Sequence, residues 1–176
     1  MNVRVTMTGL SKTARRAALI IAVAAGAVVL LPNGAAEAQA QARAPRTGAQ
    51  IFSSTCAACH QAQGEGTNVY PPLAGSEWVN GPESRVVRII LHVLTGDVEV
   101  QGQVYNGAMP AWGPSLSDDE IAAVATYIRS SFGNRALPIT AATVAEARAA
   151  YPGRTTPWTM PELLLIKAGE KTQGTR

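Results

Sequence analysis

Two thiols and an imidazole lie within five positions of one another, at Cys56, Cys59 and His60. They include both cysteines of the 176-residue chain and one of its two histidines. On a helix, positions i, i+3 and i+4 share one face, so the three side chains would point the same way. C-x-x-C-H is the pattern by which two thiols form thioethers with the vinyl groups of a haem while the imidazole turns toward the iron. The motif therefore predicts covalent haem attachment.

Two other interpretations of the motif stay open from the residues alone. A dithiol–disulfide enzyme would place the motif at a strand-to-helix junction, and nothing strand-like precedes Cys56. A zinc site needs four ligands, which Cys56, Cys59, His60 and His92 could supply only at irregular spacing. Both interpretations are weaker than the haem one.

A haem iron bound by His60 needs either a second axial ligand or an open face. The candidates are Met109 in "AMPAWG", Met160 in "WTMPEL", and His92. Met109 is preferred because Gly and Pro punctuate its segment, and a rigid loop there could hold the sulfur over the iron. Met160 lies in a C-terminal tail. His92 is expected on a helix beside Ile89 and Val93, where a half-buried structural histidine is the favoured interpretation.

The first 40 residues are typical of an export signal. A basic stretch precedes the apolar run 17–31, and "AEAQA" supplies small residues for cleavage after Ala40. Retention of this segment as a membrane tether is the alternative. Without it, the chain has 11 basic and 11 acidic residues, so the sequence offers no support for nucleic-acid binding.

The remaining chain predicts mostly helices. A helix capped by Thr47 runs into the Cys segment, a second begins at Pro82–Glu83 and stops at Gly96, and a third begins at the capping box of Ser117 and Glu120. Alternation over 97–106 predicts a short β-hairpin. A tail follows, with a helix over 141–150 and a short helix from Pro161.

Four segments, in this order, resemble a class I c-type cytochrome. They are "GAQIFSSTCAACHQAQGEG", "YPPLAG", "YNGAMPAW" and "LSDDEIAAVATYIRSSFGN", and together they cover about residues 48–134. The resemblance is to bacterial single-haem carriers and to cytochrome subunits of periplasmic dehydrogenases, nitrite reductases and oxidases. It implies an all-α fold, the class I cytochrome c fold, whose N- and C-terminal helices cross beside the covalently bound haem. The short β-hairpin insertion and the partly helical C-terminal tail, which the residues predict, exceed the minimal pattern of this family. We expect four parts: a cleaved signal (1–40), a linker (41–47), a cytochrome c domain (48–135) and an extension (136–176).

The resemblance also implies roles for individual residues. Cys56 and Cys59 would form the thioethers to one haem c, and His60 and Met109 would be the axial iron ligands. The Pro71 carbonyl would accept a hydrogen bond from His60, with Pro72 as the alternative in another register. Two pairs would meet at the helix crossing, Gly48 and Phe52 from one helix with Val124 and Tyr127 from the other. The expected haem pocket consists of Leu73, Val86, Ile90, Tyr105, Trp112 and Ile128.

The function that the resemblance implies is electron transfer without catalysis. The protein would cycle Fe(III)/Fe(II) in the periplasm, between a dehydrogenase or quinol-oxidising complex and a terminal oxidase or reductase. The alternatives are a haem c subunit of a respiratory complex anchored at the periplasmic face of the inner membrane, and a haem sensor or peroxidase. Residues 48–135 contain four arginines, no lysine and eight acidic residues. This charge favours an apolar docking patch, around Ala108, Pro110 and Trp112, over a ring of lysines.

Overall fold

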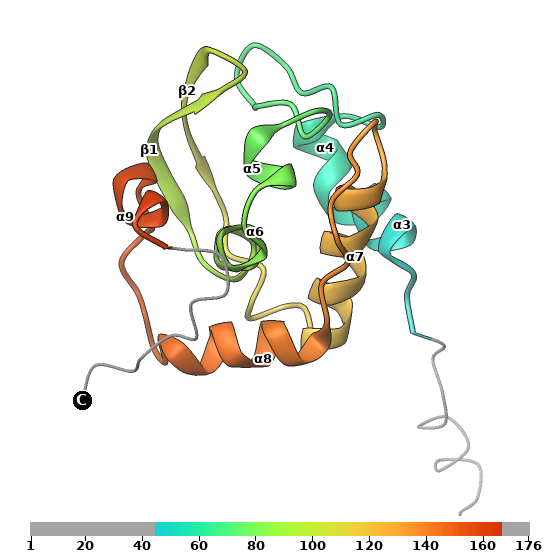
Figure 1. The fold of residues 1–176 in the computed structure, drawn as a ribbon, viewed down its shortest axis with the longest axis vertical. Coiled ribbons are helices and arrows are strands. Elements are labelled where there is room, and N and C mark those ends of the chain that lie inside the picture. Colours follow the sequence, from blue (N-terminus) through green and yellow to red (C-terminus); the bar gives the residue numbers. More distant parts are fainter. Residues whose placement is uncertain (1–44, 167–176) are drawn as a thin grey trace, which may run out of the picture. The chain divides into compact units, whose positions relative to one another are not determined.

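Among the described residues, the first element is the helix that carries the Cys motif (Figure 1). The computed structural model describes residues 45–166, so the predicted signal, its cleavage point and the alternative tether lie outside the described residues. Within 45–166, no helix has the length and apolar character needed to cross a membrane.

The predicted first helix is present, but its middle is wider than a regular α-helix. It consists of α3 (Gly48–Ile51), a π-helical turn η1 (Phe52–Cys56) and α4 (Ala57–His60). Thr47 starts it as predicted, because its hydroxyl accepts a hydrogen bond from the Gln50 N–H and the Gln50 side chain accepts one from the Thr47 N–H. Cys56 ends the π turn, and Cys59 and His60 lie on α4. Single π turns inside helices are rare and often mark functional sites.

Two helices and a hairpin follow. A short helix, α5 (Glu77–Asn80), was not predicted, and α6 (Glu83–Leu91) begins where expected. The prediction that α6 continues to Gly96 was wrong, since β1 (Leu94–Val100) already begins three residues after the helix ends.

The hairpin is longer than the expected 97–106. β1 pairs antiparallel with β2 (Gln103–Met109), from the pair Val100 and Gln103 at the turn to the pair Leu94 and Met109 at the open end. Met109 therefore ends a strand, where a loop had been expected. Pairing within the sheet fixes its backbone more firmly than a loop would.

The third predicted helix, α7 (Asp118–Ser130), crosses the first at a glycine. Ser117 and Glu120 form the predicted capping box. A methyl group on Gly48 would overlap the Ala123 carbonyl oxygen and come within 2.7 Å of the Tyr127 Cβ. Phe52 lies beside Tyr127 with ring centroids 5.6 Å apart, so the two helices meet where expected.

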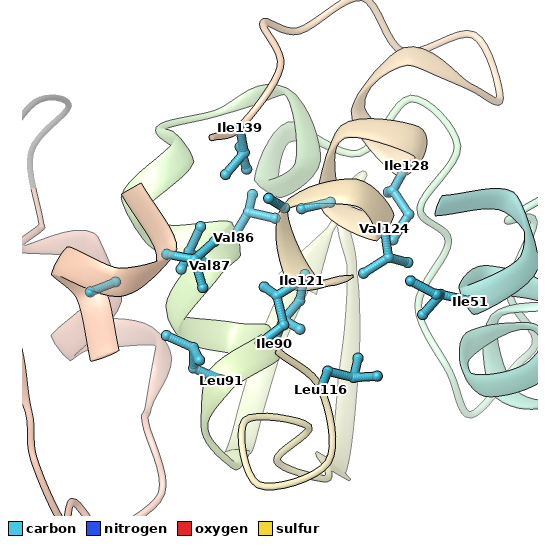
Figure 2. Packing of buried hydrophobic residues seen from close by; sticks show 14 of the residues in the cluster. Ile51, Val86, Val87, Ile90, Leu91, Leu116, Ile121, Val124, Ile128 and Ile139 are labelled. Carbon is cyan, nitrogen blue, oxygen red and sulfur yellow. The ribbon is translucent and has the colours of Figure 1, made fainter. Parts of the chain in front are cut away.

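The larger of two hydrophobic clusters within residues 45–166 lies between the first helix, α6 and α7. Figure 2 shows the aliphatic side chains of these elements turned toward one another, with Leu116 from the segment before α7 closing one end. Ile51, Val87, Ile121 and Ala125 are completely buried. Burial of apolar surface on three sides fixes the orientation of the helix that carries the motif.

The chain after Arg135 packs against this core. Helix α8 (Ala141–Ala150) matches the predicted 141–150, and α9 (Met160–Leu164) follows. Val144 and Ala147 of α8 belong to the main core, while α9 lies beside β1 (Figure 1). Residues 136–166, called the extension below, are thus part of the same packed structure.

Candidate functional site

A deep apolar cavity brings together residues that are far apart in the sequence. The empty space between its walls is about 1310 Å³, a volume that includes space open to solvent. The lining includes Cys56, Cys59, His60 and Met109, together with all six residues predicted for the pocket, namely Leu73, Val86, Ile90, Tyr105, Trp112 and Ile128. The cavity thus offers two thiols that can be linked to a haem, together with an imidazole and a methionine sulfur that can bind its iron. Its apolar walls suit the haem ring.

Both cysteines are free and half-buried at this cavity. Burial raises the pKa of Cys56 to about 11, and the neighbouring Cys59 acts in the same direction. Disulfide oxidoreductases need the opposite, a reactive thiol with a lowered pKa. The environment of Cys56 therefore does not suit the dithiol interpretation.

The loop after the motif folds back onto His60. The Gly66 N–H donates to the His60 carbonyl over 3.0 Å, and the Leu73 N–H donates to the Gly64 carbonyl over 2.7 Å. Gly66 has a φ of 69°, and a Cβ there would lie 2.5 Å from the Tyr70 carbonyl oxygen. Only glycine permits this close return, which brings Pro71 next to the imidazole.

His60 is oriented by one hydrogen bond. Its Nδ1 lies 2.9 Å from the Pro71 carbonyl oxygen, and no such contact to Pro72 is present within residues 45–166. A carbonyl can only accept, so Nδ1 carries the proton and Nε2 keeps its lone pair. Burial lowers the pKa of His60, and the Pro71 hydrogen bond opposes that effect. The imidazole is therefore neutral near pH 7 and able to bind a metal.

The three candidates for a second axial ligand lie in different places. Met109 lines the cavity from the end of β2. Met160 lines a separate, more polar hollow with Trp78, Pro82 and Arg85. The structure thus brings only Met109 to the cavity that holds His60.

His92 has structural surroundings. It follows α6, and its ring packs edge-on against Trp158 with centroids 6.4 Å apart. Burial lowers the pKa of His92, as do the charges of Arg154, Arg148 and Arg88. It does not line the cavity, and within residues 45–166 no group of three or more His, Cys, Asp or Glu side chains could hold a metal ion.

Part of the cavity wall was missed from the sequence. Val98 and Val100 of β1 line it beside Tyr105 of β2, and Ile89 and Leu94 extend the wall toward Met109. A signal was available, since the alternation in "VEV" puts Val98 and Val100 on one face of the predicted hairpin. The hairpin therefore supplies one whole wall of the cavity.

Sequence comparisons place the chain among known proteins. Residues 43–128 match the family model described as cytochrome C oxidase, cbb3-type, subunit III. A cytochrome c-552 of Thermus thermophilus is 39% identical over 110 residues, which cover 60% of this chain and 69% of that protein. Cytochrome c6 of Diacronema lutheri is 37% identical over 92 residues, 49% of this chain and 94% of that protein. The cytochrome c subunit of gluconate 2-dehydrogenase from Pantoea cypripedii is 38% identical over 108 residues, 58% of this chain but only 24% of that subunit.

This chain belongs to the class I c-type cytochromes. The helical structure with its small two-stranded sheet is consistent with their fold. The cofactor is covalently bound haem c, and the function is electron transfer.

Proposed function

We propose that this protein is an exported, single-haem electron carrier whose iron is bound by His60 and Met109. The observation that carries the proposal is the cavity that gathers Cys56, Cys59, His60 and Met109 within apolar walls. The export signal predicted over 1–40 supports a periplasmic location.

Each residue of the motif would have a separate task. The thiols of Cys56 and Cys59 would attach the group, and His60 would bind the iron through Nε2 while Pro71 fixes its ring. The soft sulfur of Met109 favours Fe(II) and so raises the reduction potential. When bound, the haem supplies an iron that gains and loses one electron. The apolar wall keeps water from the iron and from the sulfur.

Attachment can be tested by extraction. Protein made in cells with a cytochrome c maturation system should keep its haem through acid–acetone treatment. The variant with both Cys56→Ala and Cys59→Ala should lose all of its haem in this treatment. Without a retained haem the apolar cavity has nothing to fill it, so this variant should also fold poorly. Met109→Ala is the control, because it removes the proposed iron ligand and leaves both thioether bonds of the haem intact. Free extraction of haem from the unaltered protein would rule out covalent attachment.

The proposed partners are redox proteins that dock at the cavity mouth. We propose a periplasmic dehydrogenase or quinol-oxidising complex as donor and a terminal oxidase or reductase as acceptor, supported by relatives named as dehydrogenase cytochrome subunits. Exposed apolar residues border the cavity, here called the apolar rim: Val69, Tyr70, Ala108 and Pro110. Val69 is 60% exposed and Tyr70 39% exposed, so a partner would cover them.

The apolar rim predicts how electron transfer responds to salt. Over 48–135 the negative side chains outnumber the positive ones by four, and charges act over only about 8 Å at physiological ionic strength. Stopped-flow reaction with terminal-oxidase membranes of the source organism should change little over a salt series. Val69→Lys should slow the reaction by about tenfold, or ~1.4 kcal/mol. Leu137→Lys, at a residue 78% exposed outside the cavity lining, should not. A rate that collapses as salt rises contradicts apolar docking.

A further inference from the structure

Met109 lies at the end of β2, and the neighbouring strand β1 is bonded on its other edge to the extension. Its partner across the hairpin is Leu94, and Leu94 also forms a parallel bridge with Trp158 of the extension. The Thr95 N–H donates to the Trp158 carbonyl over 3.0 Å, and the Trp158 N–H donates to the Val93 carbonyl over 2.7 Å. At this end of the sheet, β1 therefore lies between the strand of Met109 and the extension.

Trp158 is itself firmly held. Its side chain is 3% exposed and packs with Leu94 and Leu163, while Met109 contacts the same cluster. The guanidinium of Arg154 lies 3.6 Å from the centroid of its ring, on the π face. Arg154 in turn donates to a Glu162 carboxylate oxygen over 3.0 Å. The extension thus packs against β1, with α9 lying beside this strand on the side away from β2 (Figure 1).

The segment that follows Met109 is held by a second part of the extension. Arg148 of α8 donates to the Gly113 carbonyl over 2.8 Å and to the Leu116 carbonyl over 3.1 Å. A third bond, 2.8 Å long, joins it to the Asp118 carboxylate at the start of α7. The loop from β2 to α7 is therefore fixed by one arginine side chain, a few residues beyond Met109.

We propose that the extension is a clamp that holds Met109 at the iron through the positioning residues Trp158 and Arg148. The proposal rests on the function proposed above, in which Met109 is the axial ligand. A bond between a thioether sulfur and iron is weak, so the fraction of time it is formed depends on how well the backbone on either side of Met109 is preorganised. The extension contacts both sides, the strand before Met109 and the loop after it.

Imidazole competes with Met109 and so reports on the clamp. The apparent dissociation constant for an external ligand falls as the fraction of molecules with an open iron site rises. Trp158→Ala and Arg148→Ala should each make imidazole bind to the ferric holoprotein about tenfold more tightly, because they raise that fraction. The Met–iron charge-transfer band should weaken in parallel.

Two variants separate positioning from general stability. Val144→Ala empties a fully buried site in α8 that takes part in none of these hydrogen bonds, so it should lower Tm without changing imidazole affinity. Trp158→Phe, in contrast to Trp158→Ala, should keep imidazole affinity and the Met–iron band close to those of the unaltered protein. The ring packing is kept, and the indole N–H has no hydrogen-bond partner within residues 45–166.

The possible results distinguish the clamp from the ligand assignment. If Val144→Ala tightens imidazole binding as much as Trp158→Ala does, the effect is general destabilisation and the clamp is overturned. If Met109→Ala loses the band while Trp158→Ala and Arg148→Ala leave imidazole affinity within about twofold, the clamp is also overturned. Should Trp158→Ala fail to fold, Arg148→Ala decides the question, with Val144→Ala as its control. A band that survives Met109→Ala overturns the ligand assignment itself.

Discussion

Met109→Ala should abolish the Met–iron charge-transfer band, lower the reduction potential and open the iron to carbon monoxide or imidazole. Met109 is the only methionine among residues 45–166 that lines the cavity containing His60. A thioether ligand favours Fe(II), so its loss should lower the potential by on the order of 0.1 V, within the ~0.8 V range that axial ligands set. Absorption spectra and a redox titration of the purified holoprotein measure both effects.

Met160→Ala is the matched control for this prediction. Met160 is also followed by proline and has a tryptophan two positions away, but it lines a different hollow, beside Trp78 and Arg85. Its removal should leave the band and the potential unchanged. The reverse result would assign the iron to Met160 and would refute the site described above. Rapid carbon monoxide binding to the unaltered protein would instead favour a sensor or peroxidase.

The sequence was most informative where a single residue type decides the local structure. The C-x-x-C-H spacing predicts the cofactor, because two thiols and an imidazole at this spacing on one helical face suit covalent haem attachment. Side-chain caps decided where helices begin, so Thr47 and Ser117 were located correctly. These signals are local, and distant parts of the chain hardly alter them.

Structure that depends on distant partners was harder to predict. The stretch from His92 to Gly96 follows a helical pattern, yet Leu94 enters a strand because it pairs with Met109 and Trp158, 15 and 64 residues away. The bounds of helix α8 were predicted correctly. Its buried side was not, because alanines lie all around the helix and only Val144 and Ala147 are buried. The packing of the extension, on which the clamp depends, therefore became visible only in three dimensions.

Gly48→Ala should be among the most destabilising single substitutions in this protein. The first helix and α7 approach so closely that a Cβ on Gly48 overlaps the Ala123 carbonyl oxygen and lies 2.7 Å from the Tyr127 Cβ. Neither neighbour is the flexible end of a side chain, so the helices must separate. Overpacking usually costs about 1–3 kcal/mol, and contact with a backbone carbonyl places this change at or above the upper end.

The separation would also reach the haem site through Phe52, which lies four residues after Gly48. Its ring packs against Tyr127 at 5.6 Å and Phe132 at 5.0 Å, on the π turn that ends at Cys56. Moving this helix outward displaces the motif relative to the cavity wall. We therefore expect Gly48→Ala to lower the yield of holoprotein as well as its stability.

Denaturant unfolding of the holoprotein measures the effect, with Ala49→Val as the control. Ala49 is the next residue on the same helix and is exposed, so two extra methyl groups there meet solvent and should change the unfolding free energy by less than about 0.5 kcal/mol. Gly48→Ala adds one carbon and should cost about 3 kcal/mol or more, equivalent to roughly 10 °C in Tm for a chain of this size. If both substitutions cost the same, the helices do not cross at Gly48 as closely as described. The orientation of Cys56 and His60 would then depend on the core and the Pro71 contact alone.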